Sequence, residues 1–314
     1  MEGETEIALF IYKYYKTTRG EFKDMLLSLT ISAIVIGSVY GLIALGYSLI
    51  YSASGLMTFC QGEILMFGAF IGLTFFRYLE WPFLIALLLT MLIMFVLGML
   101  IERLLIRPIL SRHATDIYIV LATIALGIVI TNVAQQIWGT HAVQFPAIFG
   151  VDTINILGTM VQPEAFVCIF VGAFAMLGIH LFMNKMKFGT SMRAAAMSPM
   201  AARSVGINVD LTTGITWGMS CALAGVAGIL LGPVQGVSIS MGSTIGTKAF
   251  AAAVIGGYGN MYGAIIGGLI IGFTETFSAA YITSDYKDFI TYGLLALCMV
   301  FLPRGILKGD VYDR

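Results

Sequence analysis

Three ionisable residues stand inside long apolar stretches of this sequence, where a charge is costly. On helix-insertion scales, a charged side chain at the centre of a bilayer costs about 2.5–3.5 kcal/mol. Such a group requires an opposite charge, a neighbouring polar helix or a water-filled cavity, so these residues mark either a solute pathway or polar contacts between helices. We hypothesise that the lysine pairs with one of the two carboxylates. The residues are Glu63 in 53–76, Lys248 in 234–254 and Glu275 in 262–282.

No catalytic or metal-binding constellation accompanies them. The sequence contains no HExxH, GxSxG or CxxC motif, and its three histidines are scattered. A glycine-rich stretch at 257–263 has the wrong spacing for a dinucleotide loop and lacks the surrounding strand–helix–strand unit. We therefore expect no catalytic residue, no metal site and no bound cofactor. If ATP drives this protein, a partner subunit must bind it.

Composition places the protein in a membrane. Of its 314 residues, 59% are hydrophobic and 11% are charged, against about 25% charged in soluble domains, and the mean hydropathy is +0.93. A chain of this length cannot bury so much apolar surface in a soluble core. We therefore expect membrane lipid to surround most of the protein. The net charge is zero, which gives no reason to expect nucleic acid as a partner.

Nine apolar segments predict the helices that position the ionisable residues. Because lipid-exposed backbone must satisfy its own hydrogen bonds, and because these segments are too long and continuous for barrel strands, the spans are helical. We predict an all-α polytopic integral membrane protein, a bundle of about eight transmembrane helices with some broken or re-entrant. The segments are 27–51, 53–76, 82–101, 117–138, 165–183, 211–231, 234–254, 262–282 and 289–302.

The chain divides into one membrane domain and two short ends. Residues 1–25 form an N-terminal extension, either a surface helix or disordered, residues 26–304 form the transmembrane domain, and 305–314 form a cytoplasmic tail. Lys and Arg in 102–116, in 184–210 and after Leu302 predict that these segments are cytoplasmic. The segment 139–164, which has neither residue, is then external. Counting back places the N-terminus outside, against its four basic residues, unless one early segment does not cross.

Glycine spacing predicts close helix packing. Gly259, Gly263 and Gly267 follow at four-residue intervals, about one helical turn, so they should share one face. Small faces let helices approach closely in lipid. Such smooth faces would also allow helices to slide between states.

The longest cytoplasmic loop, 184–210, contains a segment rich in Ala and Met between Ser191 and Val205, interrupted by Pro199. A proline there predicts two short helices or one bent helix. An exposed surface of small residues and methionines suits a groove in a partner protein. The alternative is an ordinary amphipathic connector.

Across most of its length, from Gly37 to Leu307, the chain resembles the LivH-type permease subunits of branched-chain amino acid ABC importers. Each matching string is weak alone, but together they are specific. Two departures stand out: the family usually has His at Gln61, and acidic residues at Met197 and Ser198. The matching strings are Gly37–Ser48, Phe59–Glu63, Arg193–Ala196, Val205–Asn208, Lys248–Gly257, Ser278–Asp288 and Leu302–Leu307.

The resemblance implies a heteromeric importer in the cytoplasmic (inner) membrane of a bacterium or archaeon. Its partners would be ABC ATPase subunits, a second related permease and an external solute-binding protein. It also implies an ATPase-coupling segment, to which we assign Arg193, Ala194, Ala195, Ala196, Ala202 and Gly206. Three alternatives remain at this point: a urea or short-amide importer permease, a stand-alone transporter or channel, and a membrane scaffold or sensor.

Overall fold

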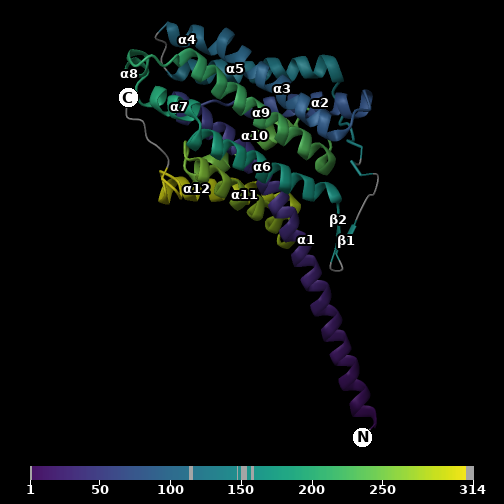
Figure 1. Ribbon diagram of the computed structural model, residues 1–314. Helices are drawn as coiled ribbons and strands as arrows, with labels where there is room; N and C mark the ends of the chain where they lie inside the picture. The colour runs from purple at the N-terminus through teal and green to yellow at the C-terminus, as the bar shows by residue number, and fades with distance from the viewer. Residues whose placement is uncertain (1, 113–115, 147, 150–153, 157–158, 309–314) are drawn as a thin grey trace.

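A computed structural model describes residues 2–112, 116–146, 148–149, 154–156 and 159–308 as a helical bundle with one long helix projecting from it (Figure 1). Short π-helical turns extend α2 and α3 (η1, Thr74–Tyr78; η2, Glu102–Ile106), and a 3-10 turn precedes α12 (η3, Ser284–Tyr286). The other elements are α1 (Glu2–Ser54), α2 (Gln61–Leu73), α3 (Phe83–Ile101), α4 (Arg107–Ser111), α5 (Asp116–Trp138), β1 (Ile154–Ile156), β2 (Thr159–Val161), α6 (Pro163–Lys185), α7 (Lys187–Met197), α8 (Pro199–Ser204), α9 (Val209–Gln235), α10 (Met241–Gly256), α11 (Met261–Tyr281) and α12 (Lys287–Phe301).

The predicted class, an all-α polytopic membrane protein, is confirmed. In the described part of the chain, six helices are long and apolar enough to span a bilayer: α1, α3 with its extension, α5, α6, α9 and α11. The apolar helices α2, α10 and α12 are shorter, as expected of broken or re-entrant segments. The small antiparallel hairpin β1–β2 lies in the connection between α5 and α6.

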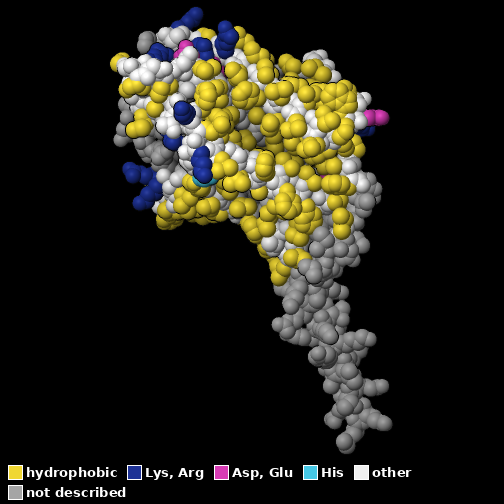
Figure 2. All heavy atoms as spheres, in the orientation of Figure 1, with side chains coloured by type: hydrophobic (Ala, Val, Ile, Leu, Met, Phe, Trp, Pro, Cys, Tyr) yellow, Lys and Arg dark blue, Asp and Glu magenta, His cyan; other side chains and the backbone are white. Residues whose placement is uncertain are grey.

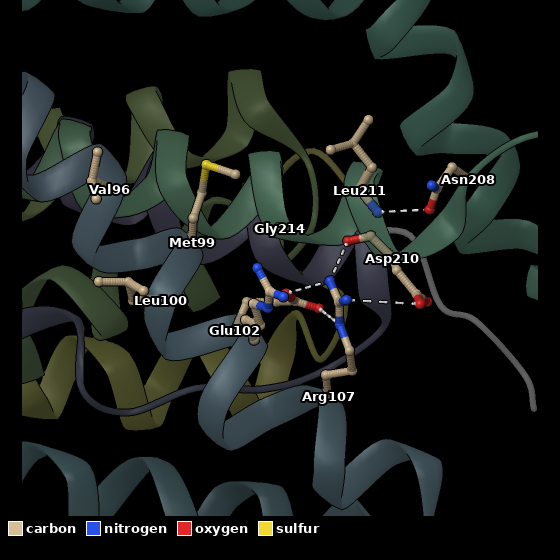
Figure 3. A pocket seen from close by; sticks show the side chains of 10 residues that line it. Val96, Met99, Leu100, Glu102, Arg107, Asn208, Asp210, Leu211 and Gly214 are labelled. Carbon is tan, nitrogen blue, oxygen red and sulfur yellow. Dashed lines mark hydrogen bonds and ion pairs between the residues drawn. The ribbon is translucent and has the colours of Figure 1, made fainter.

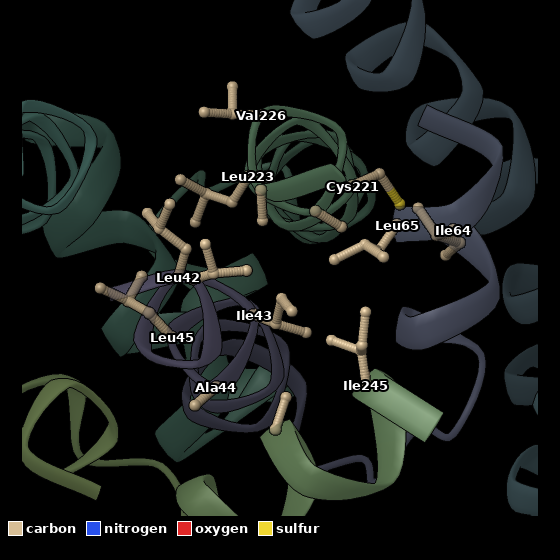
Figure 4. Close-up of a cluster of buried hydrophobic side chains, with 14 of the residues drawn as sticks. Leu42, Ile43, Ala44, Leu45, Ile64, Leu65, Cys221, Leu223, Val226 and Ile245 are labelled. Atoms are coloured by element: carbon tan, nitrogen blue, oxygen red, sulfur yellow. The ribbon is translucent and has the colours of Figure 1, made fainter. Parts of the chain in front are cut away.

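Helix α9 forms the centre of the bundle. In its most apolar window 89% of residues are buried, against 28% in α5 and 22% in α6, which places α5 and α6 at the periphery. Hydrophobicity alone does not place α9 there, because α5 and α6 have a higher mean hydropathy (2.3 each, against 1.7 for α9) and lie at the periphery, where lipid chains suit apolar side chains. Small residues of α9, among them Gly218, Gly225 and Gly228, let α2 and α3 approach it closely. Its side chains meet those of α1, α2 and α10 in one apolar cluster that includes Ile43, Leu65, Leu223 and Ile245 (Figure 4).

Glycines set the closest helix contacts, as predicted for Gly263 and Gly267. A Cβ atom at Gly267 would overlap the carbonyl oxygen of Ala252 on α10, and one at Gly263 would overlap that of Gly256. Gly259 does not share this face. It lies in the turn before α11 with φ +89°, a left-handed conformation that glycine adopts without steric cost.

The two ends of the bundle differ in charge and in connections. Helices α4, α7 and α8 and the last turn of α12 lie together at one end, and β1–β2 lies toward the other (Figure 1). Lys and Arg side chains gather at the first end, and apolar side chains cover the wide face between the ends (Figure 2). The segments predicted to be cytoplasmic are therefore on one side of the molecule.

Short backbone pairings fasten the connections at each end. Val143, after α5, and Val237, before α10, exchange two hydrogen bonds of 2.8 and 2.9 Å. The C-terminal segment pairs with the end of α10, because the Ile306 amide donates to the Ile255 carbonyl at 2.9 Å. Residues 309–314 of the predicted tail, and residue 1 of the N-terminal extension, lie outside the described residues. The remainder of that extension continues into the first span as one helix.

Candidate functional site

Glu63 lies in the first turn of α2, and its carboxylate packs against Gly127 of α5 beside a small cavity. The chain is non-helical from Gly55 to Cys60 before α2 begins at Gln61, so the carboxylate sits at a helix start, where a negative charge is favoured. The cavity has a volume of about 290 Å³, and its wall includes Phe59, Thr131 and Asn132 as well as Glu63. Among the described residues, no Lys, Arg or His pairs with this carboxylate.

Lys248 instead pairs with Glu275, which is one of the two pairings that the sequence suggested. Its Nζ lies 2.5 Å from Glu275 Oε1 and 2.7 Å from Asp288 Oδ1. The Tyr40 hydroxyl donates to the other Glu275 oxygen at 2.6 Å, and Lys287 lies 3.9 Å from the first. The side chains of Lys248 and Glu275 are only 3% and 9% exposed. This network joins α1, α10, α11 and α12.

Gln61, where the resemblance led us to expect His, is fully buried at the contact of α2 with α9. Its Nε2 donates to the Ser220 hydroxyl at 2.6 Å and to the Ser220 carbonyl at 2.9 Å. The Ser220 hydroxyl donates in turn to the Gly46 carbonyl on α1 at 2.8 Å. Three central helices are therefore joined by one polar chain just beside Glu63, in which the buried Gln61 Oε1 accepts no hydrogen bond from the described residues.

The Ala- and Met-rich loop forms two short helices, α7 and α8, which was one of the two predicted forms. They meet at Ser198, whose hydroxyl accepts a hydrogen bond from the Ala201 amide at 3.3 Å, and Pro199 occupies the first position of α8. This combination is typical of a helix start, because proline has no amide hydrogen to leave unsatisfied there.

Most alanines of this segment face the bundle, whereas Ala201 is exposed. Ala195, Ala196 and Ala202 are buried, and Ala194 is half-buried. The outward surface consists of larger apolar residues that the assignment of coupling residues omitted. Met197, Met200 and Val205 are 78%, 82% and 75% exposed.

The other two assigned coupling residues hold the ends of the segment. The Arg193 guanidinium donates to the Met183 carbonyl near the end of α6, so it tethers α7 to a spanning helix. Gly206 has φ +85° and open space around it, and its conformation reverses the chain between α8 and α9.

One ionic cluster was missed by the sequence analysis. Arg107 bonds the buried Glu102 carboxylate at 2.9 Å, and it also donates to the Asp210 carbonyl at 3.0 Å (Figure 3). The Asp210 carboxylate pairs with Arg203 of α8 at 3.1 Å. The cluster borders a cavity of about 460 Å³ between α3 and α9. Through it, the end of α3 is joined directly to α8 and the start of α9.

Comparison with known proteins decides the family. A model of the branched-chain amino acid transport system permease component matches residues 29–299. The high-affinity branched-chain amino acid transport system permease protein LivH of Escherichia coli K12 is 32% identical over 90% of this chain and 96% of its own length. The chain belongs to the branched-chain amino acid transport permease family.

Two further relatives extend this assignment. Permease protein BraD of Pseudomonas aeruginosa is 31% identical over 90% of this chain and 96% of its own length. Permease protein LivM of Escherichia coli K12 is 22% identical over 88% of this chain and 70% of its own length. No solved structure gave a significant match. All these relatives are named as transport permeases, so this permease is a multi-pass membrane transport subunit and not an enzyme.

Proposed function

We propose that this permease is one membrane subunit of an ATP-driven importer of branched-chain or other apolar amino acids. The observation that carries the proposal is the match of nearly the whole chain to LivH, which is named for that transport system. The additional similarity to LivM, a second permease named for the same system, supports a pair of related permeases. We place the complex in the cytoplasmic (inner) membrane of a bacterium or archaeon.

The structure suggests how the permease receives energy from outside itself. Helices α7 and α8 present Met197, Met200 and Val205 at one end of the bundle, and this exposed apolar surface supports a contact with another protein. Flexible methionines suit such a contact. We propose that an ATPase subunit holds this surface and that its movement on ATP binding and hydrolysis displaces α7 and α8.

Displacement of α8 reaches the spanning helices through covalent and ionic links. Arg203 on α8 bonds Asp210 at the start of α9, and Arg107 connects Asp210 to Glu102 at the end of α3. A solute delivered by an external binding protein would then be exposed alternately to the two sides. Such a change requires the nucleotide to favour one of two states of the bundle.

Reconstitution tests this function. The permease would be placed in liposomes with the ATPase subunits, the second permease and the binding protein, and offered labelled leucine, urea and acetamide. We expect leucine uptake that depends on ATP and on every partner. Uptake of urea or acetamide in place of leucine would assign the permease to another substrate class. Flux through this chain alone without ATP would overturn the ATP-driven mechanism.

A further inference from the structure

The surface of the bundle is apolar over most spanning helices. The large hydrophobic side chains that point outward from α3 and α6 are leucine, isoleucine, valine, methionine and phenylalanine, which suits contact with lipid chains. Polar side chains are rare on lipid-facing surfaces, because water cannot satisfy them there. Examples of the outward residues are Leu84, Leu88, Leu92, Phe170 and Phe174, each at least 50% exposed.

Helices α5 and α10 depart from this pattern. Helix α5 exposes Asn132 and Gln136, and helix α10 exposes Ser243, Thr244 and Thr247, which lie on one side of α10 because their spacing is about one turn. At one margin of this side, the Thr247 hydroxyl lies 2.8 Å from the Tyr292 hydroxyl of α12. The Ser243 and Thr247 hydroxyls donate to backbone carbonyls of the preceding turn, and the exposed oxygens of this row can still accept hydrogen bonds from water, from a polar solute or from another protein.

The same surface continues to Glu63. On the next turn of α10, the Phe250 ring lies 5.0 Å from the half-exposed Phe59 ring, and Phe59 borders the cavity that contains the Glu63 carboxylate. Gly242 brings α10 close to α2 at this point, since a Cβ atom there would lie 3.3 Å from Glu63 Cα. We define the solute strip as Ser243, Thr244, Thr247, Phe250, Phe59 and Glu63.

The strip combines the chemistry that an apolar amino acid requires. The Glu63 carboxylate has no cation beside it among the described residues, so an incoming ammonium group would supply one. Hydrogen bonds between ionised partners are about twice as strong as neutral ones. Phe59 offers an apolar surface to an aliphatic side chain. The hydroxyls of Ser243, Thr244 and Thr247 on α10 would make polar contacts with the amino acid as it moves along the strip.

We propose that the solute strip lines the path of the transported amino acid and that Glu63 binds its ammonium group. The inference rests on the proposed function, which supplies the substrate class. Because the strip is open in a single permease, the facing wall belongs to the second permease. Glu63 is then a solute-binding residue, whereas Lys248 and Glu275, paired with each other, hold helices together.

Cysteine labelling tests whether the strip is wet. In the assembled complex with Cys298→Ser, which removes the half-buried native thiol, Thr244→Cys would be treated with a water-soluble, membrane-impermeant methanethiosulfonate. We expect modification of Thr244→Cys and none of Leu92→Cys, the control on the lipid-facing side of α3. If neither Thr244→Cys nor Leu92→Cys were labelled by the reagent, the proposal would be overturned.

Ligand protection tests the role of Glu63. Leucine should slow the labelling of Thr244→Cys, while 4-methylpentanoate, which has the same carbon skeleton but no ammonium group, should not. Glu63→Gln should abolish protection, and leucine uptake should fall about 10- to 100-fold, the range for one hydrogen bond to a charged group. Glu63→Asp, which keeps the carboxylate, should restore part of the protection by leucine and part of the leucine uptake. Protection that is equal with both compounds, or that survives in Glu63→Gln, would overturn the assignment.

These outcomes are separable from those of the proposed function. If the wild-type complex does not import leucine, the proposed substrate class fails. If it imports leucine and Glu63→Gln assembles and transports normally, the solute strip fails while the importer stands. Glu80→Gln, an exposed carboxylate outside the strip, serves as the matched control for loss of a negative charge.

Discussion

Lys248 Nζ lies 2.5 Å from Glu275 Oε1, and it is the cation that joins Glu275 to Asp288. The pair crosses from α10 to α11 in a part of the molecule from which solvent is nearly excluded. A buried pair of this kind contributes little net stability compared with apolar packing, but breaking it is costly because a charge is left without a partner. Its strongest consequences therefore come from removing one partner.

Replacement of Lys248 by Met should destabilise the permease by about 3–5 kcal/mol, because the buried Glu275 carboxylate loses its close cation and keeps only the Tyr40 hydroxyl and the more distant Lys287. Thermal unfolding of the purified complex and its yield after assembly measure this loss. The matched control is Lys287→Met, since Lys287 is 36% exposed and lies 3.9 Å from the same carboxylate. A double variant with Glu275→Gln should recover part of the loss. If Lys248→Met assembled and transported normally, the Lys248–Glu275 pair would not be important for assembly or transport.

Replacement of Gly267 by Ala should destabilise the bundle by about 1–3 kcal/mol, the range for overpacking in a close interior. The added methyl group would overlap the Ala252 carbonyl oxygen, and backbone cannot move aside as a side chain can. Gly293→Ala on α12 has open space at the same position, so it should be neutral or slightly stabilising. Denaturation of the two variants side by side compares them, and equal stability would contradict close α10–α11 packing.

Replacement of Met200 by Glu should weaken attachment of the ATPase subunits by about tenfold or more, or ~1.4 kcal/mol, because a charge would enter an apolar contact. Co-purification at graded ATPase concentration measures the change. Ile306→Glu, at the same end of the molecule and 42% exposed, provides a charge control outside α7 and α8. Retention of full ATPase binding by Met200→Glu would exclude this surface as the docking site.

Replacement of Arg107 by Gln should separate ATP hydrolysis from solute movement. The Glu102 carboxylate would lose its cation and α3 its link to Asp210, with a stability loss of about 1–3 kcal/mol for the unsatisfied buried group. We expect ATP hydrolysis to continue with severalfold fewer leucine molecules moved per ATP in reconstituted complexes. Arg112→Gln, an exposed residue at the same end, should behave as wild type. If Arg107→Gln moved as many leucine molecules per ATP as the wild type, the proposed link from α8 to α3 through Arg107 would be wrong.

The sequence predicted the elements more fully than their contacts. Apolar segments located the spanning helices, and Pro199 correctly indicated a break in the cytoplasmic loop. Two apolar runs were wrong as single spans. The run 53–76 is interrupted because α1 continues to Ser54 and α2 begins only at Gln61. The run 234–254 is interrupted because α9 continues to Gln235 and the chain turns at Gly236, whose φ is +76°. Hydropathy does not register such a turn when its residues are themselves apolar.

Contacts between distant residues were predictable only where charge was conspicuous. Lys248 and Glu275 attracted attention because each stood alone among apolar residues. Arg107 and Asp210 did not, since both lie at segment ends where charges are ordinary, and 103 positions separate them. The alanines of α7 and α8 were assigned by family resemblance. Composition could not reveal that three of them face inward while Met197 and Met200 face outward.

The two hydrogen bonds between Val143 and Val237 have a mechanical consequence. They fasten the long connection after α5 to the short turn from which α10 starts. A protein that binds the connection between α5 and α6, which we predict to be external, would therefore act on the first turn of α10 directly. The force would not have to pass through the whole bundle. Docking of the proposed solute-binding protein and movement of α10 would then occur together.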